Sequence, residues 1–173
     1  MRFIGIVLLA LTAGCLYGIV HDQVTARICV EYFTIGHPPL FHTQSPTLLA
    51  ICWGIAATWW VALPLGFSLA CAARLGSRPK KEWRDLLRPL GVLLGAMAAT
   101  AALAGITGWM LATFELLPPD RWVIANIPVD AQIPFTADAW AHSASYLSGF
   151  VGAAVLCVWV WRSRSRIAFG SIR

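Results

Sequence analysis

Residues 136–161 read TADAWAHSASYLSGFVGAAVLCVWVW, and this stretch decides the fold. Its polar and small residues recur every three or four positions, which places them on one face of a helix. That face consists of Asp138, His142, Ser145, Gly149, Gly152 and Leu156. Small residues let a second helix approach closely, and ionisable residues in an apolar segment usually face a bundle interior or water. The stretch therefore predicts a membrane-crossing helix with a polar outer end.

The composition of the whole chain agrees with a membrane protein. Of its 173 residues, 58% are hydrophobic and only 12% are charged, whereas about a quarter of the residues in soluble domains are charged. The net charge is +5, but the basic residues lie at the ends of apolar runs, where they orient a protein in the membrane. We therefore expect the lipid bilayer, and not nucleic acid, as the partner of these residues.

Four apolar runs are long enough to cross the hydrocarbon core of a bilayer. They cover residues 3–20, 47–73, 89–114 and 137–161, and they leave outer loops at residues 21–46 and 115–136. Among the thirteen Lys and Arg residues, all but Arg27 and Arg121 lie near the N-terminus, in the linker after the second run or in the C-terminal tail. The sequence predicts one all-α membrane domain, residues 1–173, with four transmembrane helices and both ends in the cytoplasm.

Each outer loop contains a short segment with the character of a β-strand. Residues 26–33 alternate in direction and include β-branched and aromatic residues, and residues 121–127 (RWVIANI) are similar. An unpaired strand edge is unfavourable, so we expect the two segments to pair in a small cap on the outer face.

Several residues predict where the helices begin and bend. Ser45 followed by Pro46 is a typical helix start, and Thr136 is the expected N-cap of the last helix. Pro64 lies within the second apolar run, and we expect it to kink that helix because proline cannot donate a backbone hydrogen bond.

The first apolar run has an alternative interpretation as a bacterial lipoprotein signal. Residues 11–15 (LTAGC) resemble a cleavage site that would leave Cys15 as a lipidated N-terminus. However, Thr12 stands where such sites usually have an aliphatic residue, and the apolar run continues to Val20. We therefore expect this helix to stay in the mature protein. The five cysteines show no CxxC spacing, so no disulfide framework is expected.

Histidines and carboxylates gather on the predicted outer side and form a candidate metal site. The candidate ligands are His21, Asp22, Glu31, Asp138 and His142. Imidazole and carboxylate groups together bind transition metals such as zinc or iron. No contiguous metal-binding signature supports this assignment, so a hydrogen-bonded polar network is the alternative, and no catalytic role is assigned. We expect His37 and His42 to be solvated loop residues.

Glycines give a reason to bring the two histidines of the first and last helices together. Gly14 and Gly18 lie on the face of the first helix that continues to His21, and Gly149 and Gly152 lie on the corresponding face of the last helix. If these faces pack together, the imidazoles come to a similar depth in the membrane.

Two stretches, YGIVHDQVTARICVEYFTIGHP and DAWAHSASYLSG, resemble a family of small four-helix bacterial inner-membrane proteins of unknown function. The resemblance implies a multi-pass protein of the bacterial inner membrane, and it implies no activity and no role for any residue. From the residues themselves we expect a membrane protein with a polar site of histidines and carboxylates at its extracytoplasmic face, which either binds a metal or forms a hydrogen-bonded network. The alternatives are a non-catalytic scaffold or accessory subunit, in a homo-oligomer or a membrane complex, and a small transporter, for which no polar path to the inner side is seen.

Overall fold

The computed structural model describes residues 2–117 and 119–170, and it describes side chains as far as residue 164. The helices are α1 (Arg2–Ile28), α2 (Val30–Thr34), α3 (Pro46–Ala56), α4 (Trp59–Arg74), α5 (Trp83–Thr113), α6 (Arg121–Asn126), the 3-10 helix η1 (Val129–Ala131) and α7 (Gln132–Gly170). The described residues contain no β-strand. The prediction of an all-α protein is therefore confirmed.

Three helices are long and apolar enough to cross a membrane, namely α1, α5 and α7. Helices α3 and α4 meet that test together, with a bend of 41° between them, so they count as a fourth segment if the bent pair forms one span. The lengths and composition are those of a multi-pass membrane protein.

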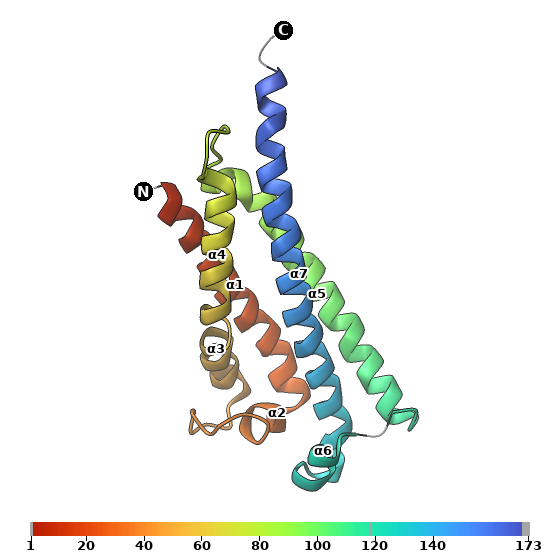
Figure 1. Cartoon of the computed structure of the whole chain (residues 1–173). Helices are drawn as coiled ribbons and strands as arrows, with labels where there is room; N and C mark the ends of the chain where they lie inside the picture. Colours follow the sequence, from red (N-terminus) through yellow and green to blue (C-terminus); the bar gives the residue numbers. More distant parts are fainter. Residues whose placement is uncertain (1, 118, 171–173) are drawn as a thin grey trace.

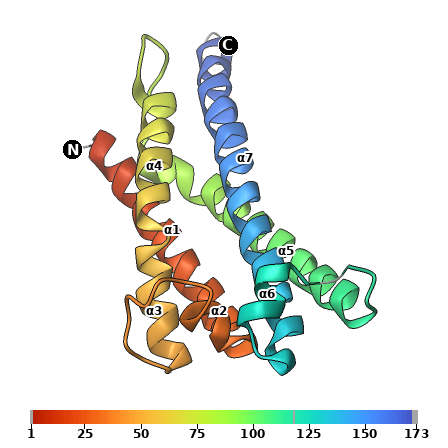
Figure 2. The same ribbon diagram turned by 60° about the horizontal axis from the view of Figure 1, so that its bottom comes forward.

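The helices form two packed groups, shown in Figures 1 and 2. Helix α1 packs against α3 and α4, α5 packs against α7, and contacts between α4 and α7 join the groups. Both chain ends lie on the same side of the molecule as the loop between α4 and α5 (Figure 1). We call this side the basic end, because that loop contains Arg78, Lys80 and Lys81. Helices α2 and α6 lie at the opposite end, which we call the histidine end.

Glycines do set the closest helix contacts, but with other partners than the sequence suggested. A Cβ atom added to Gly18 would lie 2.5 Å from the carbonyl oxygen of Gly54 in α3, so the two backbones touch. At Gly149 and Gly152 the added atom would meet long side chains of α5. The predicted glycine contact between α1 and α7 is therefore wrong. Gly54 offers α1 a matching small residue, whereas α5 fills the gaps at Gly149 and Gly152 with side chains.

The predicted strand pair is also wrong, because both segments are helical. Residues 26–33 contain the end of α1 and part of α2, so the outer loop begins later than predicted. Cys29 alone has an extended backbone, with φ of −146° and ψ of 101°. A short alternating run cannot be distinguished from a helix by periodicity alone. A cap does form from the two loops, and its buried core is Cys29, Val123, Ile127, Ala131 and Phe135.

Helix boundaries follow the local chemistry at some positions and differ at others. The Ser45 side chain accepts a hydrogen bond from the Leu48 amide, as predicted for an N-cap. Thr136 is not an N-cap, since α7 begins at Gln132 and the Thr136 hydroxyl donates to the Gln132 carbonyl at 2.8 Å. The break in the second apolar run lies between Ala56 and Trp59, whereas α4 continues through Pro64.

A buried arginine connects α7 to the basic end of the bundle. Arg164 has no exposed surface. Its guanidinium donates hydrogen bonds of 2.6–3.0 Å to four carbonyl oxygens, those of Ala72, Leu75, Arg78 and Pro79. Two of these carbonyls belong to the last turn of α4 and the residue after it, where helix carbonyls lack intrahelical partners. The arginine thus caps one helix from another.

Candidate metal centre

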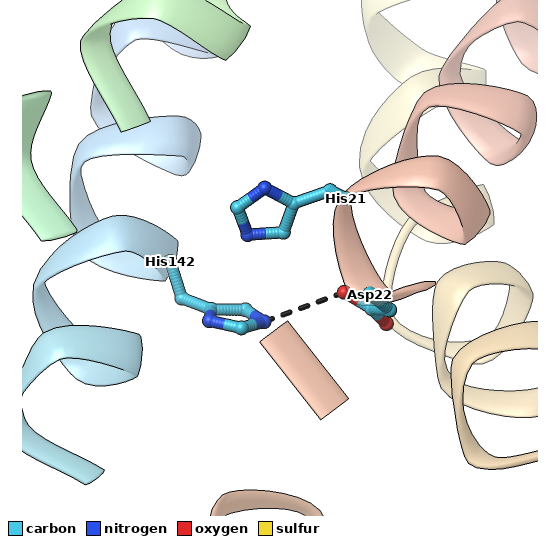
Figure 3. Close-up of side chains that lie close together, drawn as sticks. All are labelled: His21, Asp22 and His142. Atoms are coloured by element: carbon cyan, nitrogen blue, oxygen red, sulfur yellow. Dashed lines mark ion pairs between the residues drawn. The ribbon is translucent and has the colours of Figure 1, made fainter. Parts of the chain in front are cut away.

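His142 is held in α7 by a hydrogen bond to its own helix. Its Nδ1 lies 2.8 Å from the carbonyl oxygen of Asp138, one turn earlier. A carbonyl only accepts hydrogen bonds, so Nδ1 carries the hydrogen and donates it. The other ring nitrogen, Nε2, lies 3.4 Å from a carboxylate oxygen of Asp22 in α1 (Figure 3). This arrangement fixes the orientation of the ring, as carbonyl partners do for metal-bound histidines.

His21, on α1, approaches His142 from the side. The two ring centroids are 4.6 Å apart and the rings are nearly perpendicular (Figure 3). The Nε2 atom of His21 is buried and has no hydrogen-bond partner among the described residues. A buried polar atom without a hydrogen-bond partner destabilises the folded state by about 1–3 kcal/mol. We therefore expect this nitrogen to bind a ligand or a water molecule.

The geometry leaves a place for a cation between these side chains. Asp22 and His142 are both buried. With its hydrogen on Nδ1, neutral His142 turns a lone pair toward the Asp22 carboxylate, and two acceptors at 3.4 Å repel each other unless a proton or metal ion lies between them. Ligand atoms about 2.0–2.1 Å from a tetrahedral ion are themselves about 3.4 Å apart. One ligand atom from each of His21, Asp22 and His142 lies within 4.8 Å of the others.

Three of the five predicted ligands are therefore together, and two are not. The Glu31 carboxylate accepts a hydrogen bond from the Cys29 thiol at 3.4 Å, away from the group of three. Asp138 lies beside His142, but it contributes its backbone carbonyl, and its own carboxylate is outside the group. That carboxylate is almost fully buried, with one oxygen lacking a partner in the described part of the chain.

Aromatic residues of α2 cover the site, which the sequence did not indicate. The ring of Tyr32 stacks on His142 with centroids 4.4 Å apart, and Phe33 meets the same imidazole edge-on at 5.7 Å. The sequence feature that could have indicated this cover is EYF at residues 31–33. In the predicted strand, Tyr32 and Phe33 would point to opposite faces. In the helical conformation, both rings reach the imidazole.

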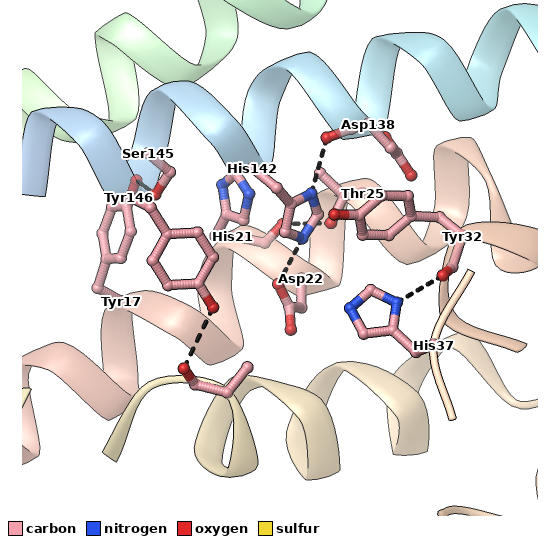
Figure 4. Close-up of polar contacts among 11 residues, drawn as sticks. Tyr17, His21, Asp22, Thr25, Tyr32, His37, Asp138, His142, Ser145 and Tyr146 are labelled. Carbon is pink, nitrogen blue, oxygen red and sulfur yellow. Dashed lines mark hydrogen bonds and ion pairs between the residues drawn. The ribbon is translucent and has the colours of Figure 1, made fainter. Parts of the chain in front are cut away.

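His37 also belongs to the surroundings of the site, contrary to the prediction that it is solvated. Its Nδ1 donates to the Tyr32 carbonyl at 2.7 Å (Figure 4). Its ring packs against Trp53, with the ring centroids 4.7 Å apart. His42 is exposed, as predicted. Pro38 and Pro39 lie within the loop between α2 and α3, and His37 before them is only partly exposed.

Two tyrosines tie the helices together around the site. The Tyr17 hydroxyl of α1 lies 2.9 Å from the Ser145 hydroxyl of α7 (Figure 4). The Tyr146 hydroxyl donates at 3.1 Å to the carbonyl oxygen of Ala57, which lies in the break between α3 and α4. Polar side chains, and not glycines, therefore bring α1 and α7 together.

Three titratable side chains in and next to α2 favour their uncharged forms. Burial raises the pKa of the Cys29 thiol to about 12, so the thiolate needed for a nucleophile or metal ligand is scarce. Burial likewise raises the pKa of Tyr32 and lowers the pKa of His37. The residues that cover the site thus present neutral groups to it.

No protein-family model matches the chain, and no curated protein or solved structure matches it significantly. The functional conclusion therefore depends on the site itself.

Proposed function

We propose that the protein is a multi-pass protein of the bacterial inner membrane that holds one transition metal ion, such as zinc or iron, at its extracytoplasmic face. The ligands are His21, Asp22 and His142. The observation that carries the proposal is a group of buried polar atoms that lack partners, because the Nε2 atom of His21 has no hydrogen-bond partner and lies beside an imidazole–carboxylate pair whose facing atoms need a proton or a metal ion between them.

Two imidazoles and one carboxylate are a common ligand set for catalytic metals. Three protein ligands leave at least one coordination position for water or a substrate, as in zinc hydrolases and non-haem iron oxygenases. A metal in such a site acts as a Lewis acid or lowers the pKa of a bound water. The chain's own part is to orient His142 through the Asp138 carbonyl and to exclude bulk water with Tyr32 and Phe33.

The metal site is tested by elemental analysis of the protein purified in detergent after growth with added zinc and iron. We expect about one ion per chain, and we expect His21→Ala and His142→Ala each to weaken metal binding about 100-fold or more, because each removes one of three ligands. The matched control is His42→Ala, which removes an exposed histidine from the same end of the molecule. It should keep the metal.

The competing function is a non-catalytic accessory subunit in which the same side chains form only a hydrogen-bonded network. It predicts a metal-free protein under metal-replete conditions. In that case the two histidine variants would change the thermal stability but not the metal content. Far-UV circular dichroism of each variant separates loss of the ligand from loss of the fold.

We further propose four membrane crossings with both chain ends in the cytoplasm. The basic end carries Arg74, Arg78, Lys80 and Lys81, and positive loops favour the cytoplasmic side. We expect a fluorescent protein fused after residue 173 to be active and a periplasmic phosphatase fused there to be inactive. Insertion of the phosphatase after the exposed residue His42 should give the opposite result. An active phosphatase at the C-terminal fusion point would contradict this topology.

A further inference from the structure

The candidate metal centre opens into an elongated apolar cleft inside the bundle. The cleft, of about 140 Å³, is bounded by residues of all the long helices and of α3. It begins at His21, Asp22 and His142 and extends toward the basic end as far as Leu69, Leu90 and Leu156. Along α1 it runs from Asp22 to Ala10, a length of about 18 Å at 1.5 Å per residue.

Small residues line the middle of the cleft. Gly14, Ala62 and Gly66 lie where α1 and α4 touch, and Ala153 lines the cleft from α7. Its volume is roughly ten times the 10–15 Å³ that one water molecule needs, and its apolar wall gives water few partners. An apolar chain fills such a space more favourably than water does.

The dimensions and the charge of the cleft define the ligand. A length of about 18 Å is slightly more than half of a hydrocarbon core of about 30 Å, which is the reach of one lipid chain. With Asp22 as its only anionic ligand, a divalent metal would leave one positive charge at the histidine end of the apolar cleft. A monoanionic head group would neutralise that charge.

We propose that the cleft binds a long-chain carboxylate, with its chain between the two helix groups and its carboxylate at the metal centre. The inference rests on the proposed function for the position of the head group, whereas the position of the chain depends on the cleft alone. A fatty acid released into the membrane is thus the substrate or ligand class that the site accepts.

The test measures binding of palmitate to the metal-loaded protein in nanodiscs, with hexadecanol as the probe that has the same chain and no carboxylate. We expect palmitate to bind more tightly than hexadecanol by about 10-fold or more, and removal of the metal by a chelator to abolish the difference. Ala153→Phe should weaken both probes about 10-fold or more, because the ring occupies the cleft. Val155→Phe is the control, since Val155 is 63% exposed on the same helix and outside the cleft.

Photocrosslinking of the unaltered protein provides a second readout that does not depend on a folded variant. A palmitate with a diazirine in mid-chain should label peptides around Ala62 and Ala153, and excess palmitate should suppress the label. Labelling only of outward-facing residues, or equal affinities for acid and alcohol in the metal-loaded protein, would overturn the inference. Metal bound with no palmitate bound would overturn it and leave the proposed function intact. Palmitate and hexadecanol bound equally without any metal would overturn both.

Discussion

Replacing Arg164 with alanine is expected to lower the free energy of unfolding by about 3–5 kcal/mol, since it leaves part-buried carbonyls without partners and creates a cavity. The guanidinium of Arg164 donates to four carbonyl oxygens and has no exposed surface. These bonds join α7 to the end of α4 and to the following loop. Thermal or denaturant unfolding in detergent, followed by circular dichroism, measures the change.

Two further variants show whether the fork-shaped head group of Arg164 is what matters. Arg164→Lys keeps the charge, but lysine has three donors on one atom and cannot reach four separate carbonyls in the same way. We expect it to recover less than half of the loss. Arg88→Ala is the control, because Arg88 is exposed on α5 near the same end. Equal stability of Arg164→Ala and Arg88→Ala would show that the buried arginine contributes nothing specific.

Replacing Gly18 with leucine is expected to destabilise the protein by about 3 kcal/mol or more, because α1 and α3 touch through their backbones. An added Cβ would meet the Gly54 carbonyl oxygen at 2.5 Å and would also meet the Thr58 hydroxyl. Neither contact can be relieved by turning a long side chain, so the helices must separate. Gly18 is one turn before His21, and we therefore expect loss of bound metal as well.

The matched control for Gly18→Leu is Gly91→Leu on α5. A Cβ added to Gly91 has no atom within 4 Å, so this variant tests the helical backbone without testing a helix contact. Both proteins are compared by their unfolding temperature and their metal content in the same detergent. If Gly18→Leu unfolds at the temperature of Gly91→Leu, the close approach of α1 and α3 is wrong.

The long helices could be predicted because hydropathy alone requires them, whereas their pairing could not. Gly14, Gly18, Gly149 and Gly152 each indicated a close helix contact, and a close contact occurs at each of them. A glycine can pack against another glycine, an alanine or a methionine, so its presence in the sequence does not show which helix will contact it. The position of the break between Ala56 and Trp59 could not be predicted either, because no proline lies there.

His21 and His142 do lie together, although the argument that predicted it relied on a contact that does not exist. The two histidines meet because both lie toward the same end of the bundle, His21 in α1 and His142 in α7. The aromatic cover could not be predicted, because Tyr32 reaches His142 only when residues 30–34 form a helix. Asp138 illustrates a further limit, since spacing of four residues predicts a neighbour of His142 but not whether its carboxylate or its carbonyl makes the contact.

The contact between Tyr17 and Ser145 joins residues 128 positions apart, and this separation determines when the site can exist during synthesis. Helix α1 is synthesised well before α7, so His21 and Asp22 are without His142 until α7 has been translated. Contacts of such long range form late in folding. Until α7 is in place, His21 and Asp22 can interact only with each other, with water or with a transient partner. Metal uptake should therefore follow insertion of the last helix, and a ribosome-bound chain that ends before α7 should bind none.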